Sequence, residues 1–95
     1  MKNAIEVLKR AKERLTPERW IQRGPGGDQE HDCLVTAIMR GPFDDMDARY
    51  VASDAVRQFT DTIMSRWQDR PGRTLAEVHA VIDLAILSLE ASEPV

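Results

Sequence analysis

The chain has little of what would point to a secreted or membrane protein. Its 95 residues include one cysteine, Cys33, so no disulfide can form within the chain. A reducing compartment such as the cytoplasm is therefore the expected location. No stretch approaches the roughly 20 apolar residues of a membrane-spanning helix, and residues 1–15 carry too many Lys, Arg and Glu side chains to resemble a signal peptide. We expect a soluble cytoplasmic protein with no membrane partner.

An excess of basic charge is also missing. The chain has 13 Lys and Arg residues against 16 Asp and Glu residues, which gives a net charge of −3. Proteins that bind nucleic acid usually carry a basic surface, so a nucleic-acid partner is not expected. A chain of this length predicts one domain, residues 1–95, with a modest core that needs no disulfide or metal to hold it.

Strand signals that could pair with one another are absent, and the apolar residues instead follow helical spacing. The strongest helix prediction is Thr74 to Glu90, where Thr74 and Glu77 have the spacing of a capping box. The residues predicted to face the core are Leu75, Val78, Ile82, Ala85, Ile86 and Leu89. A second apolar stripe consists of Ala76, Ala80, Leu84 and Leu87. A helix with two apolar faces is either central to its domain or half of an oligomer contact.

Three more segments have helical patterns. The first runs from Asn3 to Leu15 with Asn3 as its N-cap, and a short helical turn is predicted after Thr16-Pro17-Glu18. The second is Asp32 to Arg40, with Asp32 as a cap. The third covers Met46 to Gln68, as one helix or as two that break near residues 60–62. Its apolar residues at every fourth position are Val51, Ala55, Phe59, Ile63 and Trp67, with Ala48, Ala52 and Val56 beside them. The predicted fold is an all-α bundle of four to five helices around a central C-terminal helix.

Several short motifs occur in an order that resembles a small actinobacterial and actinobacteriophage family of unknown function. The motifs are Trp20, Cys33-Leu34-Val35-Thr36-Ala37-Ile38, Trp67-Gln68-Asp69, Arg73-Thr74 with Glu77-Val78, and Ile82-Asp83 with Ala85-Ile86. The family pattern is a Trp, C-L-x-G-A, W/F-N-D, R-T-x-x-E-V and L-D-x-A-I. This chain departs from it at Thr36, where the family tends to Gly, and at Gln68, where it tends to Asn. The resemblance implies a phage or actinobacterial origin and no particular activity.

The loop before the last helix contains Trp67, Asp69, Arg70 and Arg73. We interpret it first as a structured joint, in which Asp69 accepts hydrogen bonds and Arg73 pairs with a carboxylate. The alternative is a partner-binding surface, because Trp and Arg are common anchors of protein interfaces.

The second stripe of the last helix suggests self-association. Ala76, Ala80, Leu84 and Leu87 have no assigned partner within the chain, and monomers rarely leave contiguous apolar patches exposed. Two interpretations remain: a homodimer, which we favour, or a monomer in which the first helix covers the stripe.

Metal or cysteine chemistry is the alternative from another functional class. The residues that come nearest to a metal-ligand set are His31, Cys33, His79 and Asp83, but they form no CxxC or HxxxH pair. We therefore expect no metal and no cofactor. The favoured function is an accessory protein that acts through protein–protein interaction, and the alternative is a small metal-dependent or cysteine hydrolase.

Overall fold

The protein is an all-α globule, as predicted. A computed structural model describes residues 2–22, 32–40 and 45–92. In these ranges the helices are α1 (Lys2–Arg14), α2 (Leu34–Met39), α3 (Met46–Arg57), α4 (Met64–Asp69) and α5 (Leu75–Ser92). The ligand candidate His31 lies outside the described residues.

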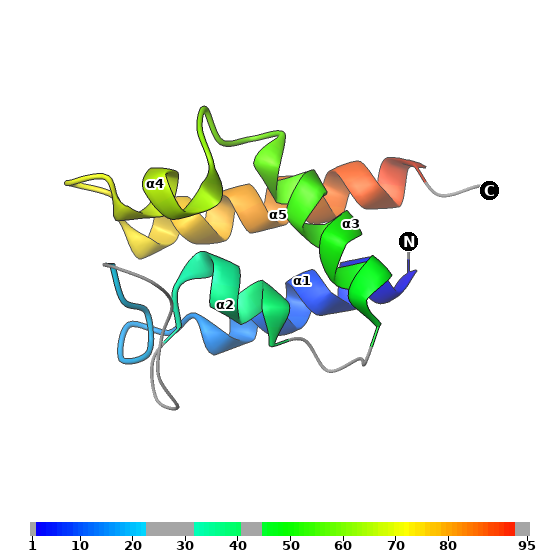
Figure 1. Ribbon diagram of the computed structural model, residues 1–95, viewed down its shortest axis with the longest axis horizontal. Coiled ribbons are helices and arrows are strands. Elements are labelled where there is room, and N and C mark those ends of the chain that lie inside the picture. The colour runs from blue at the N-terminus through cyan, green and yellow to red at the C-terminus, as the bar shows by residue number, and fades with distance from the viewer. Residues whose placement is uncertain (1, 23–31, 41–44, 93–95) are drawn as a thin grey trace.

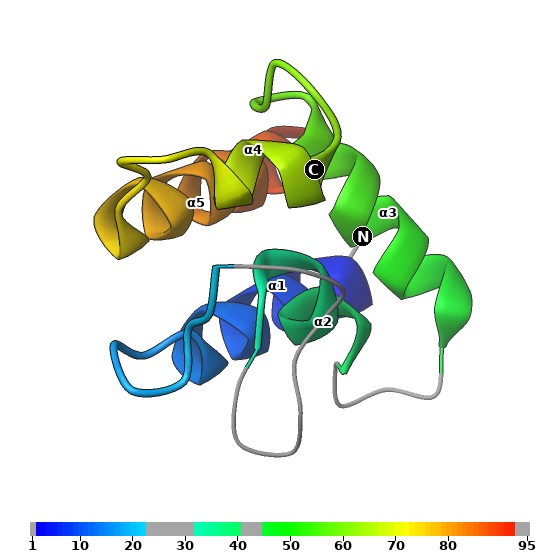
Figure 2. The same cartoon turned by 60° about the vertical axis from the view of Figure 1, so that its left-hand side comes forward.

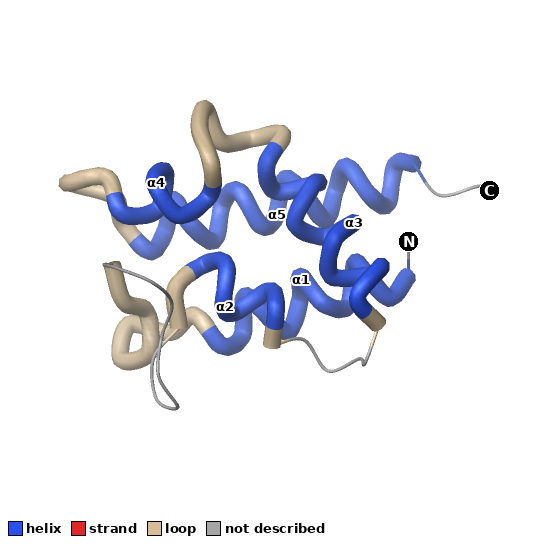
Figure 3. The backbone as a smooth tube through the Cα atoms, viewed as in Figure 1, coloured by secondary structure: helices blue, strands red, loops and turns tan. Residues whose placement is uncertain are grey.

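The two longest helices, α1 and α5, lie side by side and run in opposite directions. The start of α1 and the end of α5 lie at the same end of the molecule (Figure 1). Helix α3 packs against both of them, and α2 packs against α1, α3 and α4. Figure 2 shows α2 beside α1, with α4 next to the first half of α5. Figure 3 shows the loop between α4 and α5 at the end of the molecule away from both termini. Because α5 contacts both α1 and α3, the prediction of a central C-terminal helix is confirmed.

The core contains the face that helical spacing predicted for α5, together with one face of α1. On α1 the buried side chains include Ala4, Leu8, Ala11 and Leu15, the last just beyond the end of the helix. On α5 they are Val78, Val81, Ile82, Ala85 and Leu89, whereas Leu75 and Ile86 are half-buried. Val81 was not assigned from the pattern, and it widens the buried face of α5.

The segment from 46 to 68 forms two helices. Helix α3 ends at Arg57, the chain bends at residues 60–62, and α4 begins at Met64. The buried Thr60 stabilises the bend, since its hydroxyl donates to the Thr62 carbonyl at 2.8 Å and its own carbonyl accepts from Arg57 Nη1 at 2.7 Å. The break changes the direction of the chain, so the predicted continuous stripe does not form. The exposed members of that stripe are Val51, Phe59 and Ile63, and α3 instead buries Ala48, Ala52, Ala55 and Val56.

Two predicted helix caps are wrong. Helix α1 begins at Lys2, so Asn3 lies within its first turn, and its side-chain amide donates to Asp45 Oδ2 at 3.4 Å. Helix α2 has Cys33 as its N-cap, and the Cys33 N–H donates to Thr36 Oγ1 at 2.9 Å. Asp32 does not cap α2, because its carboxylate is used in ion pairs instead.

The capping box of α5 is confirmed. The Glu77 N–H donates to Thr74 Oγ1 at 3.2 Å, and the Thr74 N–H donates to Glu77 Oε1 at 2.9 Å. The Thr74 N–H and the Thr74 hydroxyl both donate to the Glu77 carboxylate, and these two hydrogen bonds lower the pKa of Glu77. The turn predicted after Thr16 also forms, through the bond from Trp20 N–H to the Thr16 carbonyl at 2.8 Å. It does not continue as a helix, because Trp20 then forms an isolated β-bridge with Asp32.

Candidate functional site

The second apolar stripe of α5 lies on the outer surface. Ala76, Ala80, Leu84 and Leu87 are all exposed, with Leu84 at 45% and Leu87 at 62%. They lie on the side of α5 opposite to its buried face. The interpretation in which the first helix covers the stripe is therefore wrong, because all four residues are exposed although α1 packs against α5.

The joint between α4 and α5 has the structure that its residues predicted. Trp67 is only 6% exposed. The Arg73 guanidinium stacks over the indole ring, 3.8 Å from its centroid, and Arg73 Nε donates to the Trp67 carbonyl at 3.0 Å. Arg73 Nη1 also pairs with Glu77 at 3.0 Å. A partner could not reach Trp67 without opening this stack, so the joint is a structural element first.

Of the four predicted residues in this loop, Arg70 is the exposed one. It forms two hydrogen bonds with the Asp61 carboxylate, at 2.9 and 3.1 Å, and this pairing lowers the pKa of Asp61. These hydrogen bonds connect the loop after α4 to the bend between α3 and α4. A role in partner binding for Trp67, Asp69, Arg70 and Arg73 stays a prediction.

Gln68 is the polar centre of this end of the molecule. Its side chain is fully buried, and its Oε1 accepts hydrogen bonds from Trp20 Nε1 at 2.7 Å and from the Leu34 N–H at 3.1 Å. Its Nε2 donates to the Ile21 carbonyl at 3.0 Å and to Asp69 Oδ1 at 2.6 Å. An amide side chain has two donors and a carbonyl with two lone pairs, so all four positions are used. The side chain thereby joins α4 to the segment after α1 and to the start of α2.

A second polar centre is formed by Asp32 and three arginines. The Asp32 side chain is inaccessible to solvent, and its Oδ1 lies 2.6 Å from Arg40 Nη1. Its Oδ2 lies 3.2 Å from Arg19 Nη2 and 3.4 Å from Arg14 Nε. A buried carboxylate is stable only when paired, and the three cations provide this.

Sequence patterns give little signal for these two centres. The partners of Gln68 lie far away in the sequence: Trp20 is 48 residues from it, and Leu34 is 34 residues from it. The partners of Asp32 are nearer, since Arg40 is 8 residues and Arg19 is 13 residues away, but neither lies at a spacing that predicts a contact. The signal available for Asp32 is a carboxylate directly before the apolar pair Cys33-Leu34, which indicates a charged group at the edge of a core.

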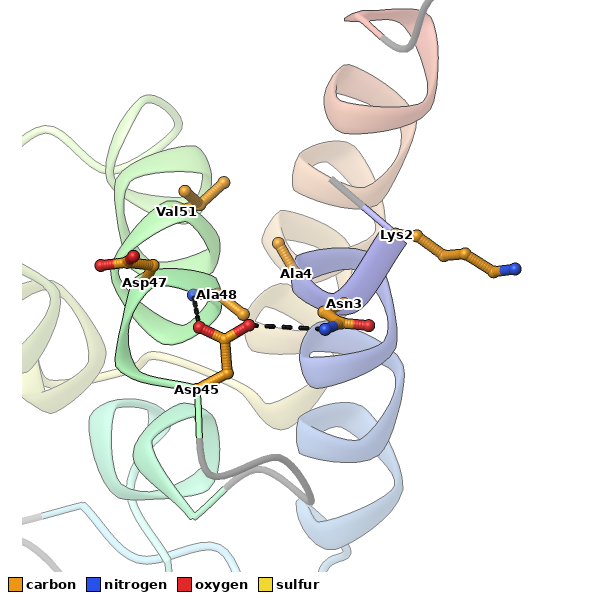
Figure 4. A pocket seen from close by; sticks show the side chains of 7 residues that line it. All are labelled: Lys2, Asn3, Ala4, Asp45, Asp47, Ala48 and Val51. Atoms are coloured by element: carbon orange, nitrogen blue, oxygen red, sulfur yellow. Dashed lines mark hydrogen bonds between the residues drawn. The ribbon is translucent and has the colours of Figure 1, made fainter.

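The surface formed by the described residues includes the two hollows described next. The first, about 370 Å³, lies between the starts of α1 and α3 and is shown in Figure 4. There the Asp45 carboxylate caps α3 through the Ala48 N–H at 3.1 Å, which lowers the pKa of Asp45, and the Lys2 and Asp47 side chains point in opposite directions. The second, about 310 Å³, is lined by Arg10, Glu13, Arg14 and Arg40.

The candidate metal ligands that the structure describes, Cys33, His79 and Asp83, do not converge. Among the described residues, no group of three or more His, Cys, Asp or Glu side chains could hold an ion. The Cys33 thiol is buried, with Thr36 Oγ1 at 3.5 Å. His79 Nε2 lies 2.7 Å from the Leu15 carbonyl, and Asp83 pairs with Lys12 at 2.9 Å. No observation favours the hydrolase alternative.

A comparison with known protein families supports membership of a family of unknown function, as the sequence resemblance implied, but does not test the origin of the protein. A family described as "Family of unknown function (DUF6197)" matches residues 1–87. The chain belongs to this family. The DUF6197 match spans all the motifs quoted above, whereas a phage or actinobacterial origin stays a prediction. No curated protein and no solved structure matches the chain. Within the described ranges, no helix has both the length and the apolar character that a membrane crossing requires.

Proposed function

We propose that this DUF6197 protein acts through protein–protein contact, and that the outer face of α5 forms a homodimer interface. The observation that carries the proposal is the exposure of Leu84 and Leu87 on the same stripe as the exposed Ala76 and Ala80. An exposed apolar stripe on a helix that already has a complete buried face is typical of an interaction surface.

The order of residues along the stripe favours a second copy of the chain as the partner. The small residues, Ala76 and Ala80, come first, and the large residues, Leu84 and Leu87, follow. Two α5 helices can pack antiparallel through their stripes about a two-fold axis that crosses each helix at the level of residue 82. In this arrangement Ala76 lies opposite Leu87, and Ala80 lies opposite Leu84. Such a two-fold contact is self-complementary, because each leucine meets the space left by an alanine.

The charges beside the stripe are compatible with this contact. Glu77 and Asp83 flank it on the two sides, and each is already paired within its own chain, with Arg73 at 3.0 Å and with Lys12 at 2.9 Å. Two copies can therefore approach without bringing unpaired carboxylates together. The stripe from Ala76 to Leu87 is about 17 Å long at 1.5 Å per residue, so the interface is small. A dissociation constant of about 10–100 µM is expected.

Leu84→Glu tests the proposal. The charge falls in the centre of the contact, so the variant should stay folded and run as a monomer where the parent is a dimer. Mass from light scattering should be measured from micromolar to several hundred micromolar protein, with circular dichroism to confirm folding. Ile63→Glu is the matched control, because Ile63 is 53% exposed and lies outside α5. A parent that is monomeric at every concentration, or an Ile63→Glu variant that dissociates equally, contradicts the proposal.

A second part of the proposal concerns the biological role of the protein and its cellular compartment. From the resemblance given above, we propose an accessory role in a phage or its actinobacterial host. The cytoplasm is the matching compartment, since a lone buried thiol stays reduced there. Affinity capture from such a host, compared between the parent and Leu84→Glu, would show whether the same face also binds a host protein.

A further inference from the structure

The Ser88 hydroxyl is an unused polar group beside the apolar stripe of α5. Ser88 is half-buried, and within the part of the chain that the structure describes its Oγ forms no hydrogen bond. Only its carbonyl is engaged, because it accepts from Ser92 Oγ at 3.0 Å. A serine inside a helix can satisfy its hydroxyl with water or with the carbonyl four residues earlier. Since Ser88 does not bond back to that carbonyl, its hydroxyl is available to a partner at the edge of the stripe.

Ser88 and Glu77 lie on the same edge of the stripe. Ser88 follows Glu77 by about three helical turns, so the two side chains differ by only about 20° around the helix axis. Both are on the side of Leu84, whereas Asp83 and Glu90 are on the opposite edge, next to α1. The edge that carries Ser88 therefore also carries a carboxylate, three turns away.

The antiparallel pair described above brings these two residues together. Measured from the level of residue 82, Ser88 lies about 9 Å towards the end of α5 and Glu77 about 7.5 Å towards its start, at 1.5 Å per residue. A two-fold axis between antiparallel helices sets the same edge of each helix side by side. Ser88 of each copy thus lies level with Glu77 of the other copy, to within about 1.5 Å along the helix.

We propose that Ser88 of each copy donates a hydrogen bond to Glu77 of the other, and that this reciprocal pair makes the α5 face specific for an antiparallel second copy of the chain. The inference rests on the homodimer proposed above. Apolar side chains can pack in several registers, and polar groups that pair in only one of them select it. Ser88 meets Glu77 only in the antiparallel register centred on residue 82.

Glu77 has room for this additional bond. Its Oε1 accepts the Thr74 N–H at 2.9 Å and the Thr74 hydroxyl at 3.1 Å, and its Oε2 accepts from Arg73 Nη1 at 3.0 Å. A carboxylate has about four acceptor positions, so one position on Oε2 remains. The side chain is 48% exposed, and its contacts with Thr74 and Arg73 hold it in place. Little side-chain freedom is therefore lost when a second copy binds.

Ser88→Lys tests the pair. The residues three and four positions from 88 on α5 are Leu84, Ala85, Ala91 and Ser92, so the lysine gains no acidic neighbour on its own helix. Across the dimer it faces Glu77, and the dissociation constant should fall about fivefold. Ser88→Glu places like charges together and should raise it about fivefold. Sedimentation equilibrium measures both constants, and circular dichroism confirms folding.

A second substitution assigns the effect to Glu77. In a Glu77→Gln background the gain from Ser88→Lys should disappear, because the opposite charge is gone. Glu90→Gln is the matched control: it removes an exposed carboxylate from the opposite edge and should leave the gain unchanged. If Ser88→Lys does not fold, Ser88→Ala replaces it, and this variant should raise the dissociation constant about threefold in the parent but not in Glu77→Gln.

The outcomes separate this pair from the homodimer itself. A parent that is monomeric at every concentration overturns both. A dimeric parent in which Ser88→Lys gives no gain, or keeps its gain in the Glu77→Gln background, overturns the Ser88–Glu77 pair and leaves the homodimer standing. A gain that is lost with Glu77→Gln and kept with Glu90→Gln supports the antiparallel register.

Discussion

Replacing Gln68 with Met should destabilise the protein without creating a cavity. Met and Gln have similar length and volume, so the substitution removes the amide while keeping the side chain's space filled. Four hydrogen bonds are lost, to Trp20, Leu34, Ile21 and Asp69. The effect therefore measures how much the polar centre contributes, separately from packing.

The magnitude follows from the burial of the groups left without a partner. The Leu34 N–H is buried, and a buried donor without an acceptor costs about 1–3 kcal/mol. Trp20 and Ile21 are half-buried and should add roughly 1 kcal/mol each, whereas Asp69 can bond to water. Since burying a thioether is easier than burying an amide, part of this loss is offset. The free energy of unfolding should fall by about 2–4 kcal/mol.

Urea unfolding followed by circular dichroism measures this change. At an m value of about 1.5 kcal/mol per M, the midpoint should fall by roughly 1.3–2.7 M. Fluorescence provides a second readout, because the chain has two tryptophans and one of them, Trp20, bonds directly to Gln68. The matched control is Gln58→Met, since Gln58 is exposed at the end of α3. That variant should stay within about 0.5 kcal/mol of the parent.

Gln68→Asn separates the effect of side-chain length from the effect of the amide group. Asn keeps the amide but is one methylene shorter, so it cannot hold all four partners unless α4 moves closer. Its stability should lie between those of the parent and Gln68→Met. The reasoning is refuted if Gln68→Met costs less than about 1 kcal/mol, or if Gln68→Asn is the less stable of the two.

Two further predictions concern substitutions of the acidic residues Asp32 and Glu77. Asp32→Asn should lower the free energy of unfolding by about 2–3 kcal/mol, because three arginines lose a buried counter-charge while remaining about one-third exposed to water. The control in the same urea assay is Asp54→Asn, which changes an exposed side chain. Equal effects of the two substitutions would disprove a special role for Asp32. Glu77→Gln should lower the melting temperature at pH 7, and the difference from the parent should shrink as the pH falls below 4.5. The reason is that the pKa of Glu77 lies below its ordinary 4.5 in the folded chain, so its stabilisation is present above that value and disappears as the pH falls through the folded pKa; a difference that persists in acid would contradict this.

The sequence by itself determined the helices that depend on local rules. The capping box of Thr74 and Glu77 and the turn after Thr16 are contacts between residues three or four apart, so they can be read from a short window. The buried faces of α1 and α5 follow the same local spacing. The break near residues 60–62 was one of two alternatives, and the structure decided between them through contacts of Thr60.

Only the tertiary structure decided which polar groups are buried and which apolar groups remain exposed. Asp32 looked like a helix cap, but the chain brings Arg14, Arg19 and Arg40 around it, and paired charge replaces capping. Gln68 became a central residue because α4 packs beside a segment 46 to 48 residues earlier in the chain. Helix α5 has two apolar faces in sequence, and α1 and α3 cover one of them. The other, from Ala76 to Leu87, stays at the surface because no helix in the described part of the chain packs against it.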